Sequence, residues 1–321
     1  MLMFTYMSSP EAAPQLLDRP DRKLVLRGDG KLDPAIGKIA LSLTGVDKPR
    51  MLIIPTAAPS IKYYRENVGL MQAMYEQMGA DVKVLHEFGK LPTNEEVREA
   101  FEWADAYDGT GGSTKNAVRD MTRTGIRRAI KNFRGVGAGG SATYNTHFKQ
   151  SLSWNTPRPE THPEENAFID VDGLQYTNEH TGEIEGIVNV LEGSPHADFI
   201  EGNFKDYPGE DVMLVDGVLQ EVTDPRSVHL SRSLERQWAS GETSGIPIGL
   251  ATDNDAAIVF DGSGRFWAAQ KEHAVKHDGS GYPVGVTAWH QSESGLAIPR
   301  LFTPAEGAMP IAALIAPPLA A

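Results

Sequence analysis

The chain contains 321 residues, 40% of them hydrophobic, which is enough to bury a substantial core. Its formal net charge of -13 argues against a nucleic-acid partner, because a phosphate backbone would be repelled. The absence of cysteine excludes disulfides, thiolate nucleophiles and zinc–thiolate sites, and the expected location is the cytoplasm.

The amino-terminal segment, residues 1–22, carries Pro10, Pro14 and Pro20 among mixed polar residues and is interpreted as an irregular arm. Residues 1–15 lack a basic region that leads into a long apolar run, so no secretion signal is expected. No segment approaches the roughly 18 consecutive apolar residues that a membrane span requires. We therefore expect no membrane partner.

Strand and helix patterns alternate along the first 145 residues. Short apolar runs predict strands at 23–27, 51–56, 81–85 and 104–107, and apolar residues at helical spacing predict helices at 33–44, 62–78, 93–103 and 115–132. Thr93 and Glu96 have the spacing of a capping box at the start of the third helix. The alternation predicts an α/β domain with a mainly parallel sheet and helices on both faces.

The second half of the chain has weaker patterns, and we assign it to the same single domain, 1–321. Residues 155–208 are polar and acidic and are interpreted as an insertion, partly hairpin, that covers or lines the site. Residues 249–260 are interpreted as a loop followed by a strand, and residues 263–321 form a carboxyl-terminal extension with short strand signals.

A glycine-rich run, Arg134 to Asn145, is the most informative stretch. Its residues Gly139-Gly140-Ser141-Ala142 fit a nucleophile elbow, in which a strand turns sharply into a helix and presents a serine hydroxyl. We interpret 137–141 as a loop, and a second glycine-rich loop, 109–114, should lie at the same carboxyl edge of the sheet. The elbow predicts strained φ and ψ and an exposed hydroxyl at Ser141. The alternative is a glycine-rich loop with an incidental serine.

A serine nucleophile needs a base, which is a histidine in most such enzymes. Among the nine histidines, His147 follows the elbow by about two helical turns and is expected to point away from Ser141. His229 stands after a predicted strand, at the start of a predicted helix, and is the candidate base.

Four segments follow one another in a characteristic order. They are the loop Gly111-Gly112-Ser113-Thr114, the elbow 139–145, Asp224 and His229 with two arginines on the following helix, and the loop and strand 249–259. In order and spacing this set resembles the peptidase E (aspartyl dipeptidase) and cyanophycinase family of serine peptidases. That resemblance implies a flavodoxin-like α/β fold, similar to that of class I glutamine amidotransferases.

The resemblance also implies roles for individual residues. Ser141 would be the nucleophile and His229 the base, and the N–H groups of Gly112 and Ala142 would form the oxyanion hole. Arg232 and Arg236 would hold a substrate carboxylate, because a guanidinium fork suits that geometry. The implied function is hydrolysis of peptide or isopeptide bonds in small, aspartyl-containing peptides, with no metal or organic cofactor. The partner is thus a small peptide, and assembly into a homo-oligomer stays open.

Two positions depart from the family pattern. Thr143 replaces the closing glycine of the elbow, so we expect a looser approach of helix to strand. Arg226 stands where the family has its histidine, and His229 follows three residues later. Glu160 and Asp224 are alternative candidates for the acid that orients the base. These departures favour a rival hypothesis, an inactive relative that binds a ligand or serves in assembly. An amidotransferase is a weaker rival, because its elbow uses cysteine.

Overall fold

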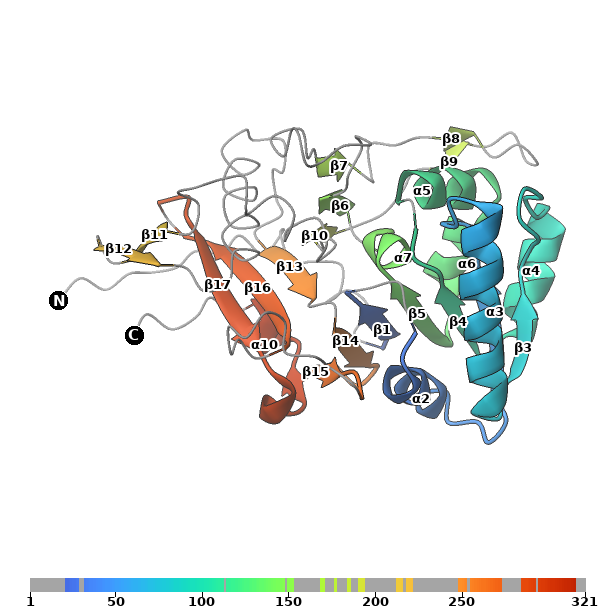
Figure 1. Cartoon of the computed structure of the whole chain (residues 1–321), viewed down its shortest axis with the longest axis horizontal. Helices are drawn as coiled ribbons and strands as arrows, with labels where there is room; N and C mark the ends of the chain where they lie inside the picture. The colour runs from blue at the N-terminus through green and yellow to red at the C-terminus, as the bar shows by residue number, and fades with distance from the viewer. Residues whose placement is uncertain are drawn as a thin grey trace.

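The computed structural model describes residues 21–28, 32–112, 114–147, 255–272, 284–292 and 294–315, together with short strands between residues 149 and 252. Its main sheet has eight strands (Figure 1), in the order β18 (Met309–Pro310), β15 (Arg265–Gln270), β14 (Ala256–Asp261), β1 (Lys23–Arg27), β5 (Val136–Gly140), β4 (Ala106–Gly109), β2 (Arg50–Ile54) and β3 (Asp81–Val84).

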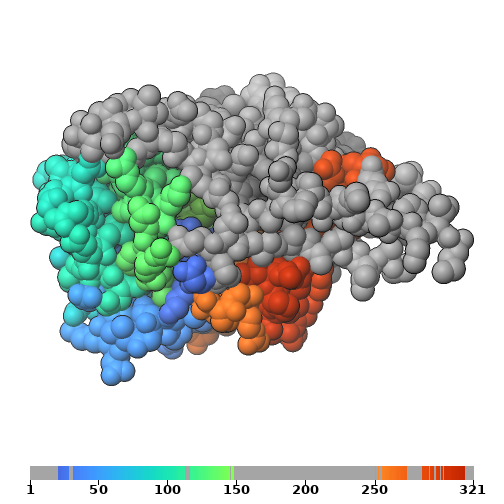
Figure 2. Space-filling view, turned by 180° about the vertical axis from the view of Figure 1, so that it is seen from behind, coloured from blue at the N-terminus to red at the C-terminus, as the bar shows by residue number. Residues whose placement is uncertain are grey.

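The main sheet has a parallel half and an antiparallel half. In the parallel half, β1, β5, β4, β2 and β3 run parallel to one another. Strand β14 pairs antiparallel with β1, and β15 and β18 continue that antiparallel half. In the space-filling view the blue-to-green residues form one flank, and the orange and red residues adjoin them (Figure 2).

Helices cover both faces of the parallel half. On one face, α2 (Pro34–Ser42) and α3 (Ile61–Gln77) contribute to a core cluster with the buried side chains of β1, β2 and β5. The opposite face packs against four helices, α4 (Asn94–Trp103), α5 (Thr114–Arg123), α6 (Ile126–Asn132) and α7 (Ala142–Asn145). The predicted α/β fold with a mainly parallel sheet is confirmed.

The antiparallel half packs against a second sheet. This three-stranded sheet has the order β13 (Ile248–Thr252), β16 (Val286–Gln291) and β17 (Ala297–Phe302). Its buried side chains form a cluster with those of β1, β14 and β15 and with α10 (Ala312–Ile315), which follows the short 3-10 helix η4 (Pro304–Glu306). The carboxyl-terminal residues are therefore part of the same packed structure as β1.

Short strands between residues 149 and 252 form three further small sheets. Their members are β10 (Val190–Gly193), β6 (Lys149–Leu152) and β7 (Phe168–Asp170), then β11 (Val212–Val215) with β12 (Val218–Glu221), and β8 (Tyr176–Thr177) with β9 (Ile184–Glu185).

Three local predictions are wrong. The single helix predicted over 115–132 is two helices, because Gly125 has a φ of 76° and breaks the helical path between α5 and α6. The first part of the segment 249–260, predicted as a loop, belongs to strand β13, which pairs with β16. The glycine-rich segment 137–141, also predicted as a loop, is for the most part the central strand β5.

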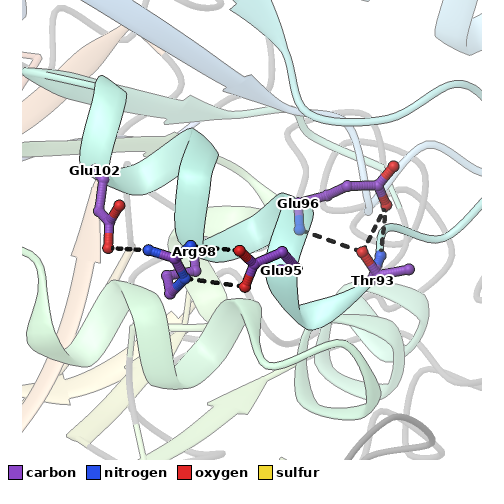
Figure 3. A network of polar contacts seen from close by, with 5 residues as sticks. All are labelled: Thr93, Glu95, Glu96, Arg98 and Glu102. Carbon is purple, nitrogen blue, oxygen red and sulfur yellow. Dashed lines mark hydrogen bonds and ion pairs between the residues drawn. The ribbon is translucent and has the colours of Figure 1, made fainter.

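The capping box at the start of α4 is confirmed (Figure 3). The Thr93 hydroxyl accepts a hydrogen bond from the Glu96 N–H at 3.2 Å, and the Glu96 carboxylate accepts from the Thr93 N–H at 2.7 Å. Farther along the helix, the guanidinium of Arg98 binds the carboxylates of Glu95 and Glu102. These contacts are local in sequence, which is why spacing alone predicts the helix start.

Within the described ranges, no helix is both long and apolar enough to cross a membrane.

Candidate active site

Strand β5 leads to the candidate nucleophile and is built almost without side chains. Its residues Val136-Gly137-Ala138-Gly139-Gly140 are all buried. The space above them is filled by neighbours: an added Cβ at Gly137 would lie 2.5 Å from the Tyr107 hydroxyl, and one at Gly139 would lie 3.0 Å from Cγ2 of Thr143. The small residues of this strand therefore make room for side chains of other elements.

Ser141 stands at the junction of β5 and α7, in the arrangement that the elbow predicts. It adopts φ 48° and ψ -111°, and among the described residues it alone has a positive φ without being glycine. Its N–H donates to the carbonyl of Arg27, the last residue of β1, at 3.2 Å. A positive φ is energetically unfavourable for any residue other than glycine. The surrounding contacts must therefore hold this backbone in place.

The exposure of Ser141 differs from the expectation, because the residue is only 4% exposed. The order of the strands explains part of this burial. Strand β5 lies between β1 and β4, in the interior of the sheet, so its end is flanked on both sides by neighbouring backbone. Ser141 therefore lies at the carboxyl end of an interior strand.

Thr143 is fully buried and does not loosen the elbow. An added Cβ at Gly109 of β4 would lie 2.1 Å from Thr143 Cγ2. The threonine therefore fits because Gly109 has no side chain. An added Cβ at Gly139 would also lie 3.3 Å from the backbone nitrogen of Tyr144, which shows how closely the helix approaches the strand. The expected looser approach is therefore wrong. The Tyr144 side chain points into another cluster, where its hydroxyl lies 2.8 Å from that of Thr252.

A buried ion pair spans β5 on the sheet face opposite to Thr143. The Arg27 guanidinium binds both carboxylate oxygens of Asp108 on β4, at 2.8 and 3.0 Å, and both side chains are inaccessible to solvent. The hydroxyl of Tyr75 on α3 donates to the same carboxylate at 2.7 Å. Arg27 pairs with Gly140 in the sheet register, so the arginine crosses β5 where that strand has no side chain. Burial and the Asp108 charge raise the pKa of Tyr75 well above its usual range, so it stays a neutral donor.

The loop after β4 carries the second proposed oxyanion donor. The chain passes from β2 outward to β3 and returns to β4 on the other side of β2, so the loops after β2 and β4 adjoin at a topological switch point. Gly112 has a φ of 135°, and an added Cβ there would lie 2.2 Å from the Ala57 carbonyl oxygen. Within the described part of the chain, no backbone carbonyl accepts a hydrogen bond from the N–H of Gly112 or Ala142.

His147 lies against Tyr107 of β4, on the sheet face that α4, α5 and α6 cover. Its ring stacks on that of Tyr107, with centroids 6.2 Å apart and planes 4° apart. Burial, with smaller contributions from the charges of Arg22 and Arg127, holds the pKa of His147 well below its usual range. The expectation that His147 points away from Ser141 stays a prediction.

Several predicted site residues lie outside the described residues. They are Ser113, Glu160, Asp224, Arg226, His229, Arg232 and Arg236. Their roles remain predictions.

Sequence reasoning missed Arg27, Asp108 and Tyr75. The available signal was a charged residue next to the apolar run of each of two strands, because buried charges in a sheet need partners.

Comparisons with known proteins bear on the family and the fold of the chain. Residues 25–181 match the sequence model of peptidase family S51. A peptidase from an acI-B1 Actinobacterium has a similar crystal structure, with a TM-score of 0.50 and 15% identity over 90% of this chain and 96% of that one. A candidate peptidase E protein from Listeria monocytogenes EGD-e aligns with a TM-score of 0.43 and 14% identity, over 78% of this chain and 98% of that one. No curated protein sequence matches the chain.

The matched region runs from within β1 through β5 and the elbow, and the structural similarity independently supports the fold. The match to peptidase family S51 over residues 25–181 confirms the resemblance inferred from the motifs of this chain.

Proposed function

We propose that the protein is a serine peptidase that hydrolyses peptide or isopeptide bonds in small, aspartyl-containing peptides, as a dipeptidase or cyanophycinase-like enzyme of the cytoplasm. The observation that carries this proposal is the backbone of Ser141, a non-glycine residue with a φ of 48° between a central strand and a helix. Strained backbone at such a junction is typical of nucleophile elbows.

In this mechanism the Ser141 hydroxyl attacks the scissile carbonyl while His229 accepts its proton. The negative charge of the tetrahedral intermediate is stabilised by the N–H groups of Gly112 and Ala142. His229 then returns the proton to the leaving amine, and water hydrolyses the acyl-enzyme by the same steps. Arg232 and Arg236 bind the carboxylate of the substrate.

A rival function is that of an inactive relative. The burial of Ser141, which is 4% exposed, favours it, because a nucleophile has to reach its substrate. Labelling distinguishes the two functions, since a fluorophosphonate reacts only with an activated serine.

The test combines labelling with turnover. We expect a fluorophosphonate to label the wild-type protein at Ser141, and Ser141→Ala to abolish both labelling and hydrolysis of a panel of aspartyl and isoaspartyl dipeptides. Loss of one hydroxyl should change the free energy of unfolding by only about 1 kcal/mol. A wild-type protein that neither labels nor hydrolyses any peptide of the panel would leave the inactive relative as the better description.

A further inference from the structure

Thr143 connects the two segments that carry the proposed oxyanion donors. Its hydroxyl donates to the carbonyl of Thr110 at 2.6 Å, and both residues are fully buried. Thr143 follows Ala142 directly, and Thr110 precedes Gly112 by two residues. One side-chain hydrogen bond therefore joins the elbow to the loop after β4.

The hydrogen bond is anchored at both ends. The N–H of Thr110 donates to the Ile54 carbonyl of β2 at 3.1 Å, so the loop is held from its other side as well. The carbonyl of Thr143 accepts from the hydroxyl of Thr146 at 2.7 Å, which fixes the helical side. Each end of the Thr143–Thr110 hydrogen bond is therefore tied to the fold by a second hydrogen bond.

A glycine at position 143 would provide no such contact. The threonine also fits only because Gly109 and Gly139 lack side chains, since an added Cβ at either would lie within 3.0 Å of Thr143 Cγ2. The hydroxyl and the two glycines thus form one packed unit between β4, β5 and α7. Both the hydrogen bond and the packing depend on Thr143, the residue that departs from the family pattern.

We propose that Thr143 is a positioning residue: its hydrogen bond to Thr110 holds the N–H groups of Gly112 and Ala142 at the spacing that stabilises the tetrahedral intermediate. The inference rests on the proposed serine peptidase function for its catalytic consequence. Its structural part, the tie between loop and elbow, does not depend on that function.

The experiment compares substitutions that differ in the hydroxyl. Thr143→Val keeps the shape of the side chain and removes the donor, and Thr143→Ser keeps the donor. Thr122→Val is the matched control, because the Thr122 hydroxyl is also fully buried and donates to a carbonyl, that of Val118, on α5. Should Thr143→Val fail to fold, Thr143→Ala and Thr143→Ser form a second pair that differs only in the hydroxyl.

For Thr143→Val we expect kcat and the rate of fluorophosphonate labelling to fall roughly tenfold to a hundredfold with KM nearly unchanged, because the affected contact acts in the transition state. Thr143→Ser and Thr122→Val should stay within about threefold of the wild type. Equal rates for Thr143→Val and Thr122→Val would overturn the proposal.

Hydrogen exchange tests the tie without activity. The backbone amides of residues 110–112 should exchange faster in Thr143→Val than in Thr122→Val, because the loop loses one of its two anchors. Unchanged exchange would also overturn the proposal. If the exchange changes but the wild-type protein is never labelled, the tie is established and the proposed peptidase function fails instead.

Discussion

At the scale of single residues, the strain at Ser141 has to be supported by its surroundings. A positive φ at a residue with a side chain costs about 1–3 kcal/mol. The Arg27 carbonyl fixes the Ser141 N–H, and the Arg27 side chain is in turn held by Asp108. The support of the elbow thus continues through β1 into a buried ion pair on β4.

This ion pair should be costly to break from one side. Asp108→Ala leaves the Arg27 charge buried without its carboxylate, and we expect a loss of about 3–5 kcal/mol in the free energy of unfolding. The apolar double variant Arg27→Met with Asp108→Leu should recover most of that loss, because it removes both charges together. Urea denaturation measures these differences.

The matched control is Asp105→Ala, which breaks a partly exposed pair with Arg50 just before the start of the same strand. Its effect should be clearly smaller, since water and salt screen that pair. An Asp108→Ala protein as stable as Asp105→Ala would contradict this account of the buried pair.

At the scale of elements, the sequence predicted most helices and strands of the parallel half, because each has its own apolar pattern or cap. Strand β5 was missed because such patterns detect apolar side chains, and three of its five residues are glycines. Ser141 was still found, since the elbow signal depends on glycines next to a serine. The positions of Thr143 and Asp108 relative to β5 could not be predicted, because they depend on the order of strands.

The packing over β5 predicts the effect of a single methyl group. Gly137→Ala would place a Cβ 2.5 Å from the hydroxyl of Tyr107, whose ring is enclosed by Phe101 and Phe133. We expect a loss of about 1–3 kcal/mol in stability from this overpacking. Tyr107→Phe removes the contacting oxygen, so the double variant should lose less than the sum of the two single variants. A double-mutant cycle from urea denaturation measures this coupling, and strict additivity would refute the contact.

At the scale of the whole molecule, the sequence predicted the fold class but not the extent of the main sheet. Residues 263–321 had only short strand signals, yet β15 and β18 extend the sheet beyond β14. Pairing of strands far apart in the chain leaves no local pattern, which is why this half could not be placed from the sequence.

Buried histidines should make the stability of the whole molecule depend on pH. Burial lowers the pKa values of His86, His147 and His290 in the folded protein. The unfolded chain therefore binds more protons, so this contribution to stability is complete above about pH 6.5 and declines as the pH falls below that value. Each such histidine makes the free energy of unfolding fall more steeply with decreasing pH, by at most about 1.4 kcal/mol per pH unit.

We expect His147→Phe to flatten this decline between about pH 6.5 and pH 5, because phenylalanine keeps a ring against Tyr107 but does not titrate. Tyr107→Phe, which alters the same stack without removing the histidine, is the control. Chemical denaturation at a series of pH values gives the slopes, and equal slopes for His147→Phe and the wild type would contradict the assignment.

The position of β1 has a consequence for how the chain is made. One edge of β1 pairs with β5, but its other edge pairs with β14, which begins more than 200 residues later. At roughly 5–20 residues per second, a ribosome needs on the order of 10–40 s to reach β14. During that interval the parallel half can assemble with an open, apolar edge at β1, and an open edge invites pairing with other chains. The nascent protein is thus most vulnerable to aggregation before its last third has emerged.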